Sequence, residues 1–134
     1  MGDDGVGCRV AERCAQTLQG IEARDLGTAG TRLLHLLPGR RKVVIVDCAR
    51  MGTKPADYRR FTPADARDRG RRPLLSLHEG SLWDVLELAR LVGSDNPDII
   101  VFGIEPDRVG PSPDLSETLR ARLDDYASAV AREF

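Results

Sequence analysis

The stretch formed by residues 41–48 places the strongest constraint on how this chain can fold. Two basic residues lead into Val-Val-Ile-Val, and the run ends at a carboxylate, Asp47, followed by Cys48. Because the apolar residues are consecutive, the pattern predicts a strand buried on both faces, as in the interior of a parallel sheet. In open α/β sheets, ligands bind beyond the carboxyl ends of the strands. We therefore expect Asp47 to lie at the functional edge of the sheet.

The rest of the chain alternates between predicted helices and strands. A second continuous apolar run at residues 98–104 predicts another buried strand, and weaker alternation predicts short strands at residues 20–25 and 57–62. Helices are expected after the glycine-rich start, before Pro38-Gly39, from an N-cap at Ser81, and from Asp114 or Ser116 onward. This order predicts one α/β domain over residues 1–134, a three-layer αβα arrangement with a mostly parallel sheet.

Two helical stripes and one charged stretch complete the prediction. Residues 64–72 predict a solvated loop whose arginines could instead dock an acidic partner. Apolar spacing marks the buried faces of the last two helices. The first stripe comprises Leu82, Val85, Leu86, Ala89 and Val92, and the second comprises Leu115, Leu119, Leu123, Tyr126 and Val130.

The bulk composition excludes several classes of protein. A net charge of −1 gives no general electrostatic case for nucleic acid or an anionic membrane. No apolar run approaches the roughly 20 residues that span a bilayer, and the acidic, glycine-rich start does not resemble a signal peptide. The three cysteines lack CxxC spacing. We expect free thiols in a cytoplasmic protein.

Three residues with metal-binding side chains fall where loops should converge at one sheet edge. They are Asp4 before the first helix, Asp47 at the end of the central strand, and His78 before a later helix. Oxygen and nitrogen donors of this kind suit nickel, zinc, iron or manganese. Each residue also has a local explanation: Asp4 (or Asp3) as a helix cap, Asp47 as a turn former, and His78 as a hydrogen-bonded loop residue.

Other arrangements of carboxylates fit the sequence less well. An acidic pair before the first helix and an aspartate ending a later strand are also typical of a phosphoacceptor receiver domain. Such a domain needs a lysine after its last strand, whereas here Ile104 is followed by Glu-Pro-Asp-Arg. A dinucleotide-binding module is disfavoured because no GxGxxG motif follows a strand.

Five blocks, in order, resemble the hydrogenase maturation protease family, the endopeptidases that trim the C-terminus of the [NiFe]-hydrogenase large subunit. The blocks cover nearly the whole chain. They are Gly-Asp-Asp-Gly-Val-Gly at residues 2–7, Asp-Leu-Gly-Thr-Ala-Gly at 25–30, Val-Ile-Val-Asp-Cys-Ala at 44–49, Ser-Leu-His-Glu-Gly-Ser-Leu-Trp-Asp-Val-Leu at 76–86, and Gly-Ile-Glu-Pro at 103–106.

The resemblance implies a fold, a site and a substrate. The family has a mostly parallel sheet of about five strands between helices, and its metal-binding trio matches Asp4, Asp47 and His78. These residues are then both the metal-binding and the catalytic set of an aspartic-type endopeptidase. The implied metal is nickel carried by the large-subunit precursor, not a cofactor stored by the protease. The resemblance implies that nickel either polarises the scissile carbonyl or only positions it, and we expect a monomer.

The start of the chain departs from the family pattern. The family begins with an apolar strand and a Gly-x-Gly-Asn turn before the acidic motif, whereas this chain begins inside that motif. Loss of an interior strand would leave unpaired backbone groups on its neighbours and remove core area. We therefore expect either a misassigned start or a poorly stable fragment. The alternative function is a non-catalytic or inactive truncated α/β binding domain.

Overall fold

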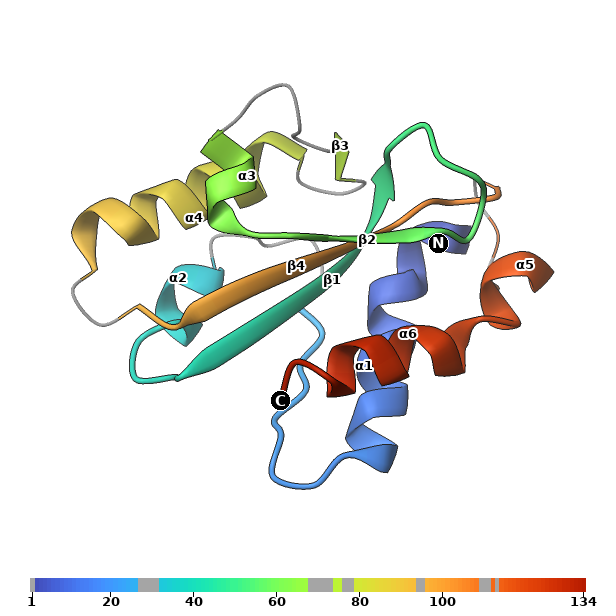
Figure 1. The fold of residues 1–134 in the computed structure, drawn as a ribbon, viewed down its shortest axis with the longest axis horizontal. Helices are drawn as coiled ribbons and strands as arrows, with labels where there is room; N and C mark the ends of the chain where they lie inside the picture. Colours follow the sequence, from blue (N-terminus) through green and yellow to red (C-terminus); the bar gives the residue numbers. More distant parts are fainter. Residues whose placement is uncertain are drawn as a thin grey trace.

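Four described strands form one sheet between helices. The computed structural model describes residues 2–26, 32–67, 74–75, 79–93, 96–108, 112 and 114–134. The elements, drawn in Figure 1, are η1 (Gly2–Gly5), α1 (Val6–Thr17), α2 (Leu33–Leu36), β1 (Lys42–Arg50), β2 (Tyr58–Phe61), α3 (Pro63–Arg67), β3 (Leu74–Leu75), α4 (Glu79–Val92), β4 (Asp98–Ile104), α5 (Glu117–Arg120) and α6 (Leu123–Ala131).

The two strands predicted from continuous apolar runs are the centre of the sheet. The strand order is β2-β4-β1-β3. β1 and β4 are parallel and stay in register from Lys42 opposite Asp98 to Cys48 opposite Ile104. β2 pairs with β4 and β3 pairs with the end of β1, both antiparallel. The predicted α/β class is confirmed, and the long central pairing is parallel as expected, although the two short outer pairings are not.

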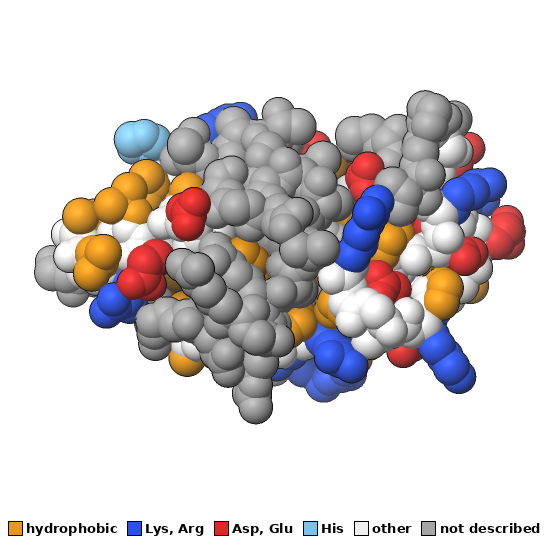
Figure 2. Space-filling view, turned by 90° about the horizontal axis from the view of Figure 1, so that it is seen from above, with side chains coloured by type: hydrophobic (Ala, Val, Ile, Leu, Met, Phe, Trp, Pro, Cys, Tyr) orange, Lys and Arg blue, Asp and Glu red, His pale blue; other side chains and the backbone are white. Residues whose placement is uncertain are grey.

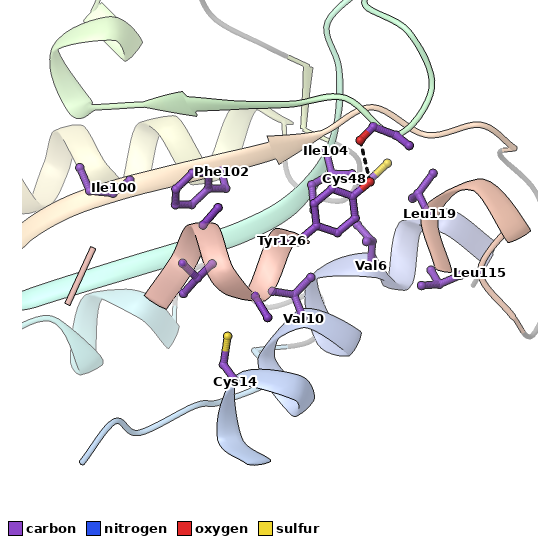
Figure 3. Close-up of a cluster of buried hydrophobic side chains, with 14 residues drawn as sticks. Val6, Val10, Cys14, Cys48, Ile100, Phe102, Ile104, Leu115, Leu119 and Tyr126 are labelled. Carbon is purple, nitrogen blue, oxygen red and sulfur yellow. Dashed lines mark hydrogen bonds between the residues drawn. The ribbon is translucent and has the colours of Figure 1, made fainter. Parts of the chain in front are cut away.

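Helices cover both faces of this sheet, which confirms the three-layer prediction. Successive side chains of β4 point to opposite faces, so Ile100 and Phe102 join a core with α1 and α6, while Ile99 and Val101 join a core with α2 and α4. The first core is shown in Figure 3, where Tyr126 of α6 lies beside Cys48 of β1. A strand between two apolar layers needs an apolar residue at every position, which explains the unbroken runs.

Several predicted elements differ in the structure. Residues 20–25 are not a strand: Gly20 makes a turn at φ +76°, and the following side chains are mostly exposed. A weak alternation of apolar and polar residues does not make this segment a strand, because none of the described strands pairs with it. The predicted last helix is two helices, α5 and α6, and Ser116 caps α5 by accepting a hydrogen bond from the Leu119 amide.

Part of the predicted charged loop is the short helix α3. Thr62 precedes it and donates its amide N–H to the Asp65 carboxylate at 2.8 Å, which resembles half of a capping box. Pro63 occupies the first helical position, where its missing N–H costs nothing. Residues 68–72, which carry most of the predicted arginine cluster, lie outside the described residues.

Helix α4 begins earlier and buries less than predicted. It starts at Glu79, so Ser81 lies inside the helix and is not its N-cap. Leu82, Val85, Leu86 and Ala89 are buried as predicted, but Val92 is 72% exposed. Figure 2 shows apolar side chains beside charged ones at the end of the molecule where α4 lies. Val92 is wrongly assigned to the stripe because the helix ends beyond the edge of the core.

Candidate functional site

Asp47 lies where the parallel pair β1 and β4 approaches its carboxyl end. It is opposite Gly103 in the register, is partly buried, and accepts a hydrogen bond from the Cys48 amide at 2.8 Å through Oδ1. β1 continues to Arg50, three residues beyond the predicted end. Asp47 is therefore held by strand pairing on a central strand, toward the carboxyl end where the sequence places it.

Asp4 is brought to the same place by the packing of α1 on β1. A Cβ atom on Gly7 would lie 2.3 Å from the carbonyl oxygen of Val46, so only glycine lets the start of α1 approach the strand this closely. Asp4, in the preceding 3₁₀ turn, and Asp47 both line a cavity of about 720 Å³. Two of the three predicted site residues thus line the same cavity.

The neighbouring Asp3 has a different role. It is fully buried, and its carboxylate accepts hydrogen bonds from the amides of Asp107, Arg108 and Ser116 at 2.7–2.9 Å and from the Ser116 hydroxyl at 3.0 Å. Burial tends to raise the pKa of Asp3, but these donors together lower it below its ordinary value. By contrast, none of the described residues donates a hydrogen bond to the Asp4 carboxylate. Asp4 therefore remains the candidate ligand of the pair.

A helix cap does not explain either aspartate. Gly5 is the N-cap of α1, and no side-chain hydrogen bond caps this helix. The predicted capping role for Asp3 or Asp4 is therefore wrong. The chain enters α1 through the 3₁₀ turn η1 instead, which directs the Asp3 carboxylate toward the loop after β4.

Glu105 is a buried residue to which the sequence analysis assigned no role. It appears there only as part of the Gly-Ile-Glu-Pro block at residues 103–106. It directly follows β4, and its Oε1 accepts hydrogen bonds from the amides of Met51 and Thr53 at 3.1 and 2.9 Å. These contacts fix the chain just beyond Asp47. The sequence signal that could have identified Glu105 is a carboxylate between an apolar strand and a proline. Its hydrogen-bond partners, Met51 and Thr53, lie more than 50 residues away in the sequence.

His78, the third predicted site residue, lies outside the described residues. The nearest described residues before and after it are Leu75, which pairs with Ala49 two residues beyond Asp47, and Glu79, the first residue of α4. Among the residues that are described, no group of three or more histidine, cysteine, aspartate or glutamate side chains could hold a metal ion. The other histidine, His35, is exposed on α2.

Burial and neighbouring carboxylates both raise the pKa of two thiols near the cavity. Burial raises the pKa of Cys48 to about 12, and the negative charges of Asp4 and Asp47 contribute to the shift. Burial likewise raises the pKa of Cys8 to about 11, with a hydrogen bond to Asp25 and further carboxylates adding to the effect. Both thiols are therefore protonated at neutral pH and poor nucleophiles. Two carboxylates at the cavity can instead act as oxygen ligands for a cation.

Cys8 and Asp25 are cavity residues that the site prediction did not include. Both line the cavity shared by Asp4 and Asp47, and the Asp25 carboxylate interacts with the Cys8 thiol. Asp25 is the first residue of the second sequence block, which is the signal that could have identified it.

Comparison with known proteins agrees with this arrangement. A family model described as hydrogenase maturation protease matches residues 8–133. The Hydrogenase 3 maturation protease of Escherichia coli (strain K12) is 31% identical over 138 aligned positions, which cover 94% of this chain and 83% of that protein. HoxM, a hydrogenase expression/formation protein of Azotobacter vinelandii, is 27% identical and covered over 65% of its length, with 98% of this chain aligned.

Solved structures show the same fold. The hydrogenase maturating endopeptidase HybD from E. coli superposes with a TM-score of 0.82 at 24% identity, covering 99% of this chain and 84% of that one. A crystal structure of the Hydrogenase 3 maturation protease gives a TM-score of 0.67 at 28% identity, covering 98% and 80% of the two chains. No helix among the described residues is long and apolar enough to cross a membrane.

Proposed function

Because this chain belongs to the hydrogenase maturation protease family, we propose that it is an endopeptidase that recognises nickel in the precursor of a [NiFe]-hydrogenase large subunit. It then removes the C-terminal peptide of that precursor. The observation that carries this proposal is the position of Asp4 and Asp47, which line one cavity that extends along β1 and reaches the carboxyl end of the strand at Asp47. We assign them, with His78, as the ligands that meet the substrate's nickel.

The surroundings of the two carboxylates support this assignment. Asp3 and Glu105 lie close by, but backbone amides already occupy their carboxylates. The negative charges of these four carboxylates favour a divalent cation. The same charges help to raise the pKa of Cys48. A nickel ion held here can polarise the scissile carbonyl or fix its position while water cleaves the C–N bond. The nearby thiols stay protonated, so we propose no covalent intermediate.

The partner and compartment follow from the same proposal. We assign the large-subunit precursor as the partner and the cytoplasm as the compartment, with the protease acting as a monomer. Three unpaired cysteines, two of them buried, suit a reducing compartment. If cleavage depends on inserted nickel, the protease must also bind the precursor before the precursor is exported or assembled.

The test is a processing assay with nickel-loaded and nickel-free precursor. We expect cleavage of the loaded precursor only, and at least about a hundredfold slower cleavage for Asp47→Asn, Asp4→Asn and His78→Ala, because losing even an outer-shell partner of a metal ligand costs about 10–100-fold. Asp98→Asn is the matched control because Asp98 lies at the opposite end of β4 and is largely exposed. Circular dichroism checks that each variant is folded. Normal cleavage by folded Asp4→Asn or Asp47→Asn would remove that residue from the site.

A further inference from the structure

Arg59 of β2 lies in the same cross-strand row as Asp47. Gly103 of β4 is opposite Asp47 of β1 on one side and opposite Arg59 of β2 on the other, and Figure 1 shows these three strands side by side. Residues that lie opposite each other in neighbouring strands direct their side chains to the same face of the sheet. Phe61 and Val101, two positions away along β2 and β4, belong to the core that includes α4. Asp47 and Arg59 therefore lie on the face of the sheet that α2 and α4 cover.

The neighbouring residue, Arg60, independently shows the direction of the Arg59 side chain. Arg60 donates hydrogen bonds from its guanidinium to the Glu133 carboxylate at 2.9 and 3.1 Å. Glu133 follows α6, which packs against the other face of the sheet. Successive side chains of a strand alternate between the two faces. Arg59 therefore points away from α6 and toward the face of Asp47.

Gly103 contributes no side chain between Arg59 and Asp47. A Cβ atom on Gly103 would lie 2.8 Å from the Cβ atom of Ala49 and 3.5 Å from Cε2 of Phe61, so a larger residue would displace its neighbours. Neighbouring strands are about 4.8 Å apart, which separates the backbones of Arg59 and Asp47 by about 10 Å. The row therefore has a basic side chain at one end, an acidic side chain at the other, and only backbone in the middle. The long arginine side chain can extend across Gly103 toward the carboxyl end of β1.

Arg59 has no partner within the described part of the fold. It is exposed, and no hydrogen bond or ion pair joins its side chain to another described residue, Asp47 included. Arg60, by contrast, is held by its ion pair with Glu133. A guanidinium carries five N–H donors in a fixed planar fork that suits oxygen acceptors. The donors of Arg59 are therefore available to a ligand that lies beside the candidate site.

We propose that Arg59 binds the substrate, with its guanidinium donating hydrogen bonds to a backbone carbonyl oxygen of the precursor segment that reaches Asp47 across Gly103. This inference rests on the proposed function. The carboxylates of the candidate site repel an acidic side chain of the substrate, whereas a backbone carbonyl is a neutral acceptor that every segment carries. Met51, which is half-buried and packs beside Gly103, offers the same segment an apolar contact.

The test combines binding and processing of the nickel-loaded precursor. Because Arg59 holds a segment beside the cut bond, its contact is the same before and during cleavage, and losing such a contact raises KM without lowering kcat. We expect Arg59→Gln to raise both KM and the dissociation constant at least about tenfold, with kcat within about twofold of the wild type. Arg59→Lys should raise them less, because lysine keeps the charge but loses the fork. The melting temperature should stay unchanged, since Arg59 makes no described contact within the fold.

Two other arginines provide matched controls. Arg41→Gln removes the same charge from an exposed arginine directly before β1, about 20 Å along the strand from Asp47, and KM should stay normal. Arg60→Gln should lower the melting temperature, because Arg60 holds Glu133, while KM of the folded variant stays normal. The losses of Arg59→Gln and Arg60→Gln should thus separate into binding and stability.

Unchanged KM and binding in Arg59→Gln would overturn the inference, as would an equal loss in Arg41→Gln or a lower kcat with unchanged KM. If the wild type binds the loaded precursor but does not cut it, the proposed function fails, while weaker binding by Arg59→Gln still supports the role of Arg59. If the wild type and Arg59→Gln cut equally well, only the inference fails. Absence of binding by the wild type would overturn both.

Discussion

Asp3 and Asp4 are adjacent in the chain but differ in what surrounds their carboxylates. The Asp3 carboxylate is buried and accepts hydrogen bonds from three amides and one hydroxyl, all from residues more than 100 positions away in the sequence. Asp4 is only partly buried and lines the cavity. At the scale of single residues, one aspartate secures the N-terminal turn and the other is available for a ligand.

Asp3→Asn should lower the free energy of unfolding by about 2–4 kcal/mol, because an amide cannot accept from all four donors and each unsatisfied buried donor costs about 1–3 kcal/mol. Urea denaturation measures the change. Asp4→Asn, one residue away, should change stability by no more than about 0.5 kcal/mol. Equal losses in the two variants would contradict the assignment of a structural role to Asp3 alone.

The contribution of Asp3 should also depend on pH. Its pKa is lower in the folded protein than the ordinary value of 3.8. The unfolded chain therefore binds a proton before the folded chain does, and stability is lost as the pH falls. The difference between the wild type and Asp3→Asn should be complete above about pH 4 to 5 and should shrink as the pH falls through the lowered pKa of the folded state.

At the scale of elements, the seating of α1 on β1 decides how close Asp4 comes to Asp47. Gly7→Ala would place a methyl group 2.3 Å from the Val46 carbonyl oxygen, so α1 must move. We expect a loss of about 1–3 kcal/mol in the free energy of unfolding, as is typical of overpacking. Processing by the folded variant should also slow, because Asp4 precedes the displaced helix.

The control for this prediction is Gln16→Ala on the exposed side of α1. Alanine has the higher helix propensity, so this change should be neutral or slightly stabilising. Urea denaturation of both variants measures the difference. If Gly7→Ala were as stable as Gln16→Ala, α1 would not be held against β1 by this close approach.

The elements that could be predicted from sequence are those with a strong local signal. The runs that form β1 and β4 predict buried strands because both faces of the sheet are covered, and Asp47 is located because it closes one of these runs. Residues 20–25 and the start of α4 were missed, since a weak alternation and a serine are each compatible with several structures. Asp4 is selected from the sequence by the resemblance, whereas the structural role of Asp3 depends on contacts to Ser116 and its neighbours, which no local pattern encodes.

At the scale of the whole molecule, Glu133 joins the C-terminal end to two strands. Its carboxylate accepts two hydrogen bonds from Arg60 of β2, at 2.9 and 3.1 Å, and lies 3.2 Å from the ammonium of Lys42 at the start of β1. Its side chain is 14% exposed. The hydrogen bond from Arg60 is the main cause that lowers the pKa of Glu133. One carboxylate therefore connects the chain end that follows α6 to the outer strand β2 and to the central strand β1.

Glu133→Gln should lower the free energy of unfolding by about 1 kcal/mol at low salt, because charge-assisted bonds to Arg60 and Lys42 are replaced by neutral ones. The matched control is Glu117→Gln, since the Glu117 side chain is 93% exposed and forms a local pair with Arg120 at 3.6 Å. That change should cost less than about 0.5 kcal/mol.

Urea denaturation at about 0.1 M and 1 M NaCl separates the two effects, because the screening length falls from about 10 Å to about 3 Å. A partly buried pair is screened less than an exposed one, so part of the Glu133 effect should persist in 1 M NaCl while that of Glu117 vanishes. Equal effects of both variants at both salt concentrations would show that the C-terminal end is not secured through Glu133.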